Sequence, residues 1–458
     1  MFTVKDILIS TGGSMLSGKE KDMLVGVSTD TRRLKPGELF VSIKGDRFDG
    51  HNFILDAVSK GAGAVLVQDG CITNSGFDMQ SVSFISVPDS IKALGDIARF
   101  HRSRFIMPLI GITGSNGKTT TKEMTAGILA RKMNVLKNFG TENNQIGVPL
   151  TLMRLAPEHK VTVLEMGTNH LGEIGRLSEI SRPTMAVITN IGPSHLEHLK
   201  DLETVLKAKS EILEYIDGKE AKLVINGDDE ILNKIKTGLK LVKFGLNKDF
   251  DFYAEKINLE PDGINFKLNG KWDIEIGLVG RHNVYNALAA IAASWDFGVS
   301  IEDIKEALRE FRVPNMRMEV KRLGDIKIIN DTYNSNPLSM KQAIDALKDM
   351  TTKGRKILVA GDMLELGTLS GRFHHLMGRQ AAESGIDLIV AVGKLAEHIA
   401  KGAQEAGMSG KKIKLCNLTK EACGAVLQLI KKGDTVLVKG SRAMKMEQIV
   451  TELEAQFK

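Results

Sequence analysis

The chain has 458 residues, too many for one ordinary hydrophobic core, and at roughly 150 residues per domain this length suggests three domains. Hydrophobic residues make up 42% of the chain and charged residues 26%, and the 45 glycines are typical of an α/β enzyme with many tight turns. The net charge of +6 is spread along the chain and only 5% of residues are aromatic, which argues against a nucleic-acid-binding protein.

Two further classes of protein are disfavoured. No segment reaches the roughly 18 consecutive apolar residues that a membrane span needs, and the first residues lack a signal-peptide pattern, so we expect a cytoplasmic protein. The three cysteines, Cys71, Cys416 and Cys423, are widely spaced. This spacing predicts reduced thiols and not a disulfide framework or a cysteine metal site.

The first hundred residues alternate short strands and helices. We predict strands over residues 37–43, 62–67 and 83–87 and helices over residues 52–60 and 91–103. Two polar loops, at residues 28–32 and 44–51, carry hydroxyl, carboxylate and cationic side chains. Such loops can hold a diphosphate and a uridine, although a turn with a surface ion pair explains them at least as well.

A glycine-rich segment at residues 111–120 predicts a phosphate-binding loop. An apolar run at residues 105–110 predicts a buried strand before it, and residues 121–133 predict a helix after it. Lys118 can reach the terminal phosphates of a nucleotide, and the Thr119 hydroxyl can ligate magnesium. The general pattern requires glycine at position 112, where this chain has Ile112, so a turn without a ligand is the alternative. The flanking elements favour a nucleoside triphosphate with Mg2+.

The middle of the chain predicts a doubly wound, mostly parallel sheet. Its strands are predicted over residues 160–167, 185–190 and 221–226, and ligands bind at the carboxyl ends of such strands. Glu165 lies at one of these ends, where a buried carboxylate is costly unless it meets a cation, so we predict a Mg2+ ligand, with a capping or salt-bridge role as the alternative. His195 follows another end and can ligate metal or orient phosphate, although a loop histidine is more often only solvated.

Two helices carry further polar candidates. Lys209 lies on a helix predicted over residues 202–215, where a lysine is by default solvated. Asn283 and Asn286 begin an alanine-rich helix and share one face, because they are three residues apart. Their amides can meet an adenine edge, although helix capping explains one of them equally well.

The link around Pro314 separates a third α/β pattern from the second. Strands are predicted over residues 326–330, 356–360, 387–392 and 434–438, and each one ends in polar or glycine-rich sequence. These ends predict a second ligand-facing rim without a phosphate loop of its own.

Taken together, these motifs resemble those of the Mur ligase family, whose ATP loop accepts a residue other than glycine at the position of Ile112. Further family positions are matched in order by Glu165, His195, Asn283, Asn286, Arg317 and Asp331. The resemblance implies an α/β protein of three domains. These are a small N-terminal UDP-substrate-binding domain (residues 1–105), a central P-loop ATPase domain with a doubly wound parallel sheet (106–313) and a Rossmann-like C-terminal domain (314–458).

The resemblance also implies an activity. Residues 330–337, 361–367 and 438–447 are most similar to members that add D-alanyl-D-alanine to UDP-N-acetylmuramoyl-tripeptide. This implies ATP-dependent amide ligation through an acyl phosphate, with Mg2+ and these two small-molecule substrates. We also expect a monomeric protein with no nucleic-acid partner and no membrane span. The alternatives are a sister ligase with another amino substrate and a nucleotide-driven switch that ligates nothing.

Finally, the resemblance assigns roles to individual residues. Catalysis is assigned to Lys118, Glu165, His195, Lys209 and Arg317. ATP binding is assigned to Gly114, Ser115, Asn116, Gly117, Lys118, Thr119, Thr120, Asn283, Asn286, Arg317 and Asp331. Metal binding is assigned to Thr119, Glu165, His195 and, if carbamylated, Lys209.

Substrate binding is divided among the three domains. UDP is assigned to Ser28, Thr29, Asp30, Arg32, Lys44, Gly45, Asp49 and His51. The muramoyl sugar or peptide is assigned to Asn143, Asn144 and Thr168, and the incoming dipeptide to Tyr333, Asn334 and Asn336. Because these residues are spread over three domains, the third domain is expected to swing onto the second about the link near Pro314.

Overall fold

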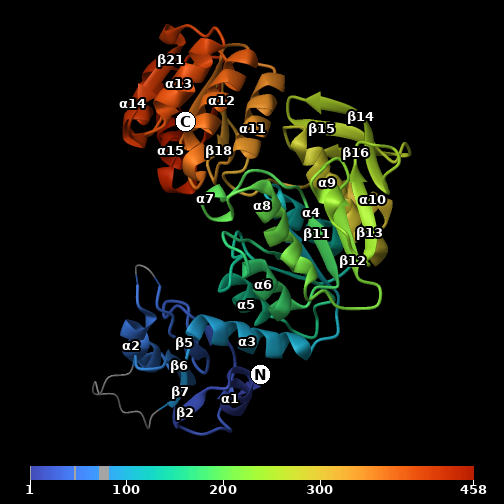
Figure 1. The fold of residues 1–458 in the computed structure, drawn as a ribbon, viewed down its shortest axis with the longest axis vertical. Helices are drawn as coiled ribbons and strands as arrows, with labels where there is room; N and C mark the ends of the chain where they lie inside the picture. Colours follow the sequence, from blue (N-terminus) through green and yellow to red (C-terminus); the bar gives the residue numbers. More distant parts are fainter. Residues whose placement is uncertain (1, 46–47, 72–81, 458) are drawn as a thin grey trace.

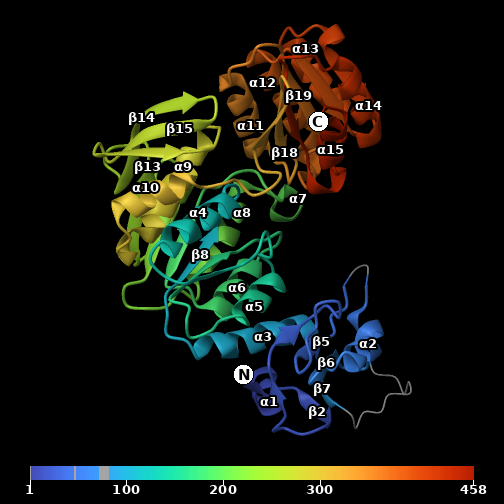
Figure 2. The ribbon, with the colours of Figure 1, turned by 180° about the vertical axis from the view of Figure 1, so that it is seen from behind.

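A computed structural model describes residues 2–45, 48–71 and 82–457 of the chain. Three α/β domains follow one another along the long axis, with the first at one end, the nucleotide-loop domain in the middle and the third at the other end (Figure 1). The view from behind shows the same order (Figure 2). This architecture confirms the predicted fold class. Among the described residues, no helix is long and apolar enough to cross a membrane.

The first domain is built on a five-stranded sheet in the order β2-β7-β6-β5-β4. The strands β4 (Val27–Ser28), β5 (Leu39–Val41), β6 (Ala64–Gln68) and β7 (Ser83–Val87) are parallel, and β2 (Ser14–Ser17) is antiparallel to β7. A two-residue pair joins β1 (Phe2–Thr3) to β3 (Met23–Leu24). The helices are α1 (Val4–Thr11), α2 (Ile54–Ser59) and α3 (Ser90–Ser103). Helix α3 runs between this domain and the next (Figure 1).

The central domain contains a nine-stranded sheet in the order β16-β15-β14-β13-β12-β11-β8-β10-β9. Its parallel strands are β8 (Leu109–Thr113), β9 (Val135–Lys137), β10 (Val161–Glu165), β11 (Met185–Ile188), β12 (Lys222–Asn226), β13 (Lys240–Gly245) and the start of β14 (Phe252–Glu260). An antiparallel extension not predicted from the sequence consists of β14, β15 (Gly263–Leu268) and β16 (Trp272–Ile276).

Helices cover both faces of this sheet, because alternate strand residues point to opposite sides. One face packs against α4 (Lys118–Ala130), α9 (His282–Ser294) and α10 (Ile301–Arg309). The other packs against α5 (Gly147–Leu152), α6 (Glu173–Ser181) and α8 (Leu202–Ser210). A four-residue helix, α7 (Leu196–Leu199), lies toward the third domain (Figure 1). The predicted doubly wound arrangement is therefore confirmed.

The predicted bounds of three elements were wrong by three or more residues. Strand β8 begins at Leu109, and the apolar residues before it form a linker in which Ile106 is fully exposed. The Arg102 guanidinium explains this, because it donates to the carbonyls of Phe105 at 2.6 Å and Met107 at 3.0 Å and so occupies the backbone. Helix α4 begins at Lys118 and not at residue 121, and helix α8 ends at Ser210, where a 3-10 turn follows.

The third domain has a six-stranded sheet in the order β17-β18-β22-β19-β20-β21. The predicted strands appear as β18 (Ile326–Asp331), β19 (Lys356–Gly361), β20 (Leu388–Val392) and β22 (Thr435–Lys439). Two edge strands, β17 (Glu319–Leu323) and β21 (Ile413–Cys416), were not predicted. The helices are α11 (Pro337–Asp349), α12 (Ser370–Glu383), α13 (Ala396–Glu405), α14 (Thr419–Leu429) and α15 (Glu447–Phe457).

Candidate active site between the central and third domains

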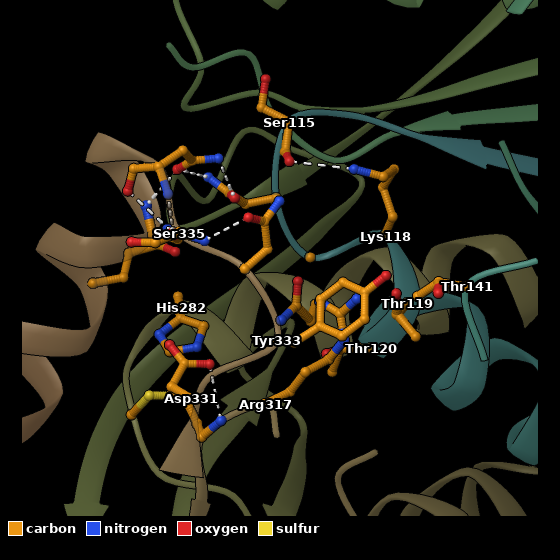
Figure 3. Close-up of a pocket in the computed structure, with 18 of the residues that line it drawn as sticks. Ser115, Lys118, Thr119, Thr120, Thr141, His282, Arg317, Asp331, Tyr333 and Ser335 are labelled. Atoms are coloured by element: carbon orange, nitrogen blue, oxygen red, sulfur yellow. Dashed lines mark hydrogen bonds between the residues drawn. The ribbon is translucent and has the colours of Figure 1, made fainter. Parts of the chain in front are cut away.

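A cavity of about 270 Å³ lies between the central and third domains. Its walls come from the carboxyl ends of β8, β10 and β11 on one side and of β18 and β22 on the other. Figure 3 shows residues of both walls, among them Lys118 and Asp331. The predicted site residues that line it are Ser115, Asn116, Gly117, Lys118, Thr119, Thr120, Asn143, Glu165, Thr168, His195, Asn283, Asn286, Arg317, Asp331, Tyr333, Asn334 and Asn336. The fold thus brings together residues that are more than 200 positions apart in the chain.

Two glycines allow the phosphate loop its tight path. Gly114 and Gly117 have φ angles of 137° and 80°, which side-chain-bearing residues rarely adopt. A Cβ at Gly117 would lie 2.3 Å from the amide oxygen of Asn286. Ile112, at the position where the general pattern has glycine, is instead a fully buried residue within β8 and pairs with Glu165 of β10. Because the turn begins after the strand, no glycine is needed there.

Lys118 lies over this loop. Its Nζ donates to the carbonyl oxygens of Gly114 at 2.9 Å and Ser115 at 3.3 Å (Figure 3). Burial lowers the pKa of Lys118, and the nearby charge of Arg317 lowers it further, while Glu165 acts in the opposite direction. Charge-assisted hydrogen bonds to phosphate are stronger than those to neutral carbonyls, so phosphate oxygens are preferred partners for this ammonium.

Glu165 is a buried carboxylate with neutral partners. Its Oε2 accepts from the Thr119 hydroxyl at 2.7 Å and its Oε1 accepts from the Asn143 amide at 2.7 Å. Only 1% of the residue is exposed, and no cationic side chain of the described residues forms an ion pair with it. A buried carboxylate without a cation is unfavourable, and the hydroxyl beside it is a second hard oxygen donor. This donor set fits Mg2+.

His195 lies on the cavity wall in an unusual backbone conformation. Its φ of 53° places it in the left-handed region, just before α7. Its Nδ1 lies 2.5 Å from Oε2 of Glu365, in the loop after β19 of the third domain. Hydrogen bonding to His195 lowers the pKa of Glu365. The predicted metal ligand is therefore also a contact between domains, which the sequence did not indicate.

Lys209 is almost completely buried on α8, with 1% of its surface exposed, and it does not line the cavity. Within the described part of the chain, no hydrogen bond or ion pair reaches its Nζ. Burial lowers the pKa of Lys209 well below its usual value, and the neighbouring charge of Lys118 adds to this effect, while Glu165 and Glu173 oppose it. The default expectation of a solvated lysine was wrong.

The start of α9 forms another part of the wall. Asn283 and Asn286 are buried and bonded to each other, because the Asn286 amide donates to Oδ1 of Asn283 at 2.9 Å. The Asn283 amide donates to the carbonyl of Val279 at 2.8 Å. His282 also lines the cavity, and burial lowers its pKa to about 4, so this imidazole is neutral at pH 7. His282 was not singled out from the sequence.

The third domain contributes cationic groups. The Arg317 guanidinium lies 4.0 Å from the centre of the Tyr333 ring, and the two stack (Figure 3). Lys439, at the end of β22, donates to Oδ2 of Asp331 at 2.6 Å and to the carbonyl of Asn334 at 2.9 Å. Lys439 was missed as a site residue, although a charged residue that ends an apolar strand is the signal that identified Glu165.

Asn336 connects the third domain to the phosphate loop. Its amide donates to Oδ1 of Asn116 at 2.9 Å, and the Asn116 amide donates to Oδ1 of Asn336 at 3.2 Å. The same Oδ1 caps α11 by accepting from the Ser339 backbone at 2.8 Å. Asn336 therefore already uses much of its hydrogen-bonding capacity within the protein.

The remaining predicted residues lie away from the cavity. Asn144 accepts from the backbone at the start of α5. In the first domain, hydrogen bonds from Arg32 lower the pKa of Asp30 to about 2. The His51 ring bridges Asp49 and the backbone of Gln68, at 2.6 and 3.1 Å. Residues 46 and 47 of the second predicted loop lie outside the described residues, and the predicted UDP contacts stay predictions: Ser28, Thr29, Asp30, Arg32, Lys44, Gly45, Asp49 and His51.

Comparison with known families gives one consistent result. Three family models match successive parts of the chain. They are the Mur ligase family catalytic domain over residues 24–102, the Mur ligase middle domain over residues 112–294, and the Mur ligase glutamate ligase domain over residues 316–442.

Individual proteins are similar over the full length. The UDP-N-acetylmuramoyl-tripeptide--D-alanyl-D-alanine ligase of Bacillus subtilis is 38% identical over 98% of both chains, and that of Escherichia coli is 37% identical over 94% of both. A crystal structure of MurF from Acinetobacter baumannii has a TM-score of 0.89 and 32% identity over 99% of both chains. MurF ligase from Thermotoga maritima in complex with ADP has a TM-score of 0.82 and 27% identity, over 95% of this chain and 98% of that one.

Proposed function

The chain belongs to the Mur ligase family, and we propose that it joins D-alanyl-D-alanine to UDP-N-acetylmuramoyl-tripeptide in an ATP-dependent amide ligation. The full-length similarity to ligases of this name supports the two substrates. The cavity between the central and third domains supports the chemistry, because it holds a phosphate loop on one wall and a separate polar rim on the other.

The reaction requires activation of a carboxylate. An amine does not displace oxide or hydroxide from a carboxylate at neutral pH, so the tripeptide's terminal carboxylate attacks the γ-phosphorus of ATP and ADP leaves. The D-alanyl-D-alanine amine then attacks the acyl phosphate, loses a proton and expels inorganic phosphate. There is little covalent chemistry for the protein to perform, so catalysis consists mainly of positioning and charge neutralisation.

The phosphate loop and third-domain residues supply this positioning. Lys118 exchanges its two loop carbonyls for oxygens of the β- and γ-phosphates. Asn283 and Asn286 border the adenine, and Arg317 and Asp331 approach the nucleotide from the third domain. The neutral His282 between these groups can accept or donate a hydrogen bond without adding charge.

Mg2+ fits the oxygen donors of Thr119 and Glu165, and when bound it neutralises charge on the phosphate oxygens. His195 lines the same cavity, and together with Glu165 it would hold a second Mg2+. Asn143 and Thr168 also line the cavity, where they would contact the muramoyl sugar or peptide of the acceptor. We also propose that the protein acts as a monomer in the cytoplasm.

Lys209 is proposed to be carbamylated, which would turn a buried cation into an oxygen ligand for a second Mg2+. Its burial and lack of a hydrogen-bond partner among the described residues favour the neutral amine that reacts with CO2. Lys209→Ala is expected to lose activity and to recover it with short carboxylic acids. Full activity of Lys209→Ala without any added acid would contradict the assignment.

One observation carries the proposal: the buried Thr119–Glu165 pair lies at the phosphate loop and opens into a cavity shared with the third domain. The test is phosphate release from ATP, measured across a panel of amino acids and dipeptides. Release is expected only with both the UDP-muramoyl tripeptide and D-alanyl-D-alanine. Rapid hydrolysis with neither would favour a nucleotide-driven switch, and release with another amine would favour a sister ligase.

A further inference from the structure

A second lysine of helix α4 is buried without a role in the proposed reaction. Lys122 is one turn after Lys118 and has no exposed surface. Its Nζ donates to the carbonyl oxygens of Asn138 at 2.8 Å and Gly140 at 3.1 Å, and it lies 2.7 Å from Oε1 of Glu123. The three protons of the ammonium therefore meet three acceptors, and two of these belong to one loop, residues 138–143.

This loop is also bonded to the strand that ends in Glu165. The buried Asn138 side chain accepts from the Glu165 backbone N–H at 3.0 Å and donates to the Glu165 carbonyl at 3.1 Å. The same amide donates to the Glu142 carbonyl at 2.9 Å. The Asn138 side chain thus fixes both the N–H and the carbonyl of Glu165, and it also forms a hydrogen bond within the loop.

The far end of the loop reaches the carboxylate. The Asn143 amide donates to Oε1 of Glu165 at 2.7 Å, and the Asn143 carbonyl accepts from the Gly167 backbone at 2.8 Å. A Cβ at Gly167 would lie 2.7 Å from Oδ1 of Asn143, so glycine is required for this close approach. The loop therefore contacts both the backbone and the carboxylate of Glu165.

We propose that Lys122 is a positioning residue that fixes the 138–143 loop and, through Asn138 and Asn143, sets the orientation of the Glu165 carboxylate for Mg2+. The inference rests on the proposed metal role of Glu165. It adds to the machinery of the site a residue that does not line the cavity.

The choice of lysine supports a role beyond packing. A buried charge often contributes no more stability than an apolar side chain of similar volume, because the cost of desolvation offsets the attraction. A methionine would fill the same space but would donate to neither carbonyl. What the ammonium adds is a fixed position for two carbonyl oxygens at the start of the loop. Partners of a metal ligand that act in this way typically change metal affinity about 10- to 100-fold when they are removed.

The test compares Lys122→Met with Lys137→Met in the full-length protein. Lys137, on neighbouring β9, forms an ion pair with the same Glu123 but contacts no carbonyl of the loop among the described residues. ADP binding is measured by calorimetry across a range of Mg2+ concentrations. Lys122→Met is expected to raise the Mg2+ concentration for half-maximal binding about tenfold. Lys137→Met is expected to leave this midpoint within about twofold of the parent protein, because Glu123 keeps its contact with Lys122 and the bonds from Lys122 to the loop carbonyls remain.

Two further variants make the result decisive. Asn143→Ala removes the last link at the edge of the cavity, and it is expected to raise the Mg2+ midpoint even if Lys122→Met does not fold. Glu165→Gln is the reference variant and is expected to raise the Mg2+ midpoint. If it does, an unchanged midpoint in Asn143→Ala, or in folded Lys122→Met, would overturn the positioning role of Lys122. An unchanged midpoint in Glu165→Gln would instead remove the metal role of Glu165 and the inference with it.

Discussion

The two interfaces of the central domain are built differently. The interface with the first domain is rich in buried charge: Asp96 of α3, whose side chain is 5% exposed, contacts Lys92 at 2.8 Å and Arg176 of α6 at 2.8 Å. Arg102 of α3 is also buried and donates to the Ser181 carbonyl at the end of α6 at 3.1 Å. Ionic and backbone contacts thus join α3 firmly to α6.

The interface with the third domain relies on neutral or exposed contacts. The Asn116–Asn336 amide pair carries no charge, and the Glu365 side chain facing His195 is 45% exposed. Where α11 approaches the central domain, a Cβ at Gly192 would lie 2.8 Å from Leu338, so the surfaces meet at a residue without a side chain. From this contrast we propose that the first two domains act as one body, which would hold the acceptor, while the third domain moves over the nucleotide.

The largest expected effect concerns the charged interface. Asp96→Ala leaves the Arg176 guanidinium without one of its carboxylates, and breaking a buried ion pair costs about 3 kcal/mol. The loss is measured as the free energy of unfolding in urea. The matched control is Asp56→Ala, in an exposed pair with Lys60 of the same domain, which is expected to change the free energy of unfolding far less. Equal effects would mean that burial does not distinguish the two pairs.

The same carboxylate predicts a pH dependence. Burial alone would raise the pKa of Asp96, but the hydrogen bonds and charges of Lys92 and Arg176 outweigh it and lower the pKa below 3.8. A group with a lowered folded-state pKa stabilises the protein above its unfolded pKa and loses this effect as pH falls through the folded pKa. Stability is therefore expected to fall below about pH 4, and less steeply in Asp96→Asn, when urea unfolding is followed from pH 6 to pH 3. Identical slopes in the two proteins would contradict this assignment.

A smaller effect is expected at the interface with the third domain. Asn116→Ala and Asn336→Ser each remove the amide pair, and serine keeps the cap of α11. Each is expected to raise the KM for D-alanyl-D-alanine about fivefold, because one net hydrogen bond contributes about 1 kcal/mol. The double variant should be no worse than either single one. Effects that multiply would show that Asn336 contacts the dipeptide independently of Asn116.

The smallest effect is expected at the edge of this same interface. Arg322 of β17 contacts Asp262 of the β14–β15 turn, and both side chains are more than half exposed. Arg322→Ala is expected to change stability by less than about 0.5 kcal/mol and to leave the steady-state kinetics unchanged. A marked fall in kcat would show that this pair, and not Asn116–Asn336, controls the third domain.

Sequence patterns predicted the strands of the sheets well where an apolar run was followed by polar or turn-forming residues. The buried strands ending at Glu165 and Asp331 were identified because apolar runs stop at a charged residue. The β14–β16 extension was missed, although its segments alternate in polarity and the three-residue connection between Leu268 and Trp272 contains Asn269-Gly270, a typical hairpin-turn pair. The linker after α3 was mistaken for part of a strand, since composition does not show that Arg102 occupies its carbonyls.

The sequence predicted many of the residues that line the site, but not which of them contact one another. Family motifs indicated Asn116 and Asn336 separately, and nothing in the sequence shows that they pair across 220 positions. The burial of Lys209 and Lys122 was also hidden, because a lysine on a helix is usually exposed. These properties arise from tertiary packing, and only the folded chain defines them.

The most direct test of the two-interface account is energy transfer between dyes on paired domains. Labels at the exposed positions of Lys19 and Lys236 report on the first and central domains, and labels at Lys236 and Lys401 report on the central and third domains. On addition of a non-hydrolysable ATP analogue with the UDP-muramoyl tripeptide, the second pair is expected to change its transfer efficiency and the first pair to keep it. A change in the first pair with none in the second would contradict the account.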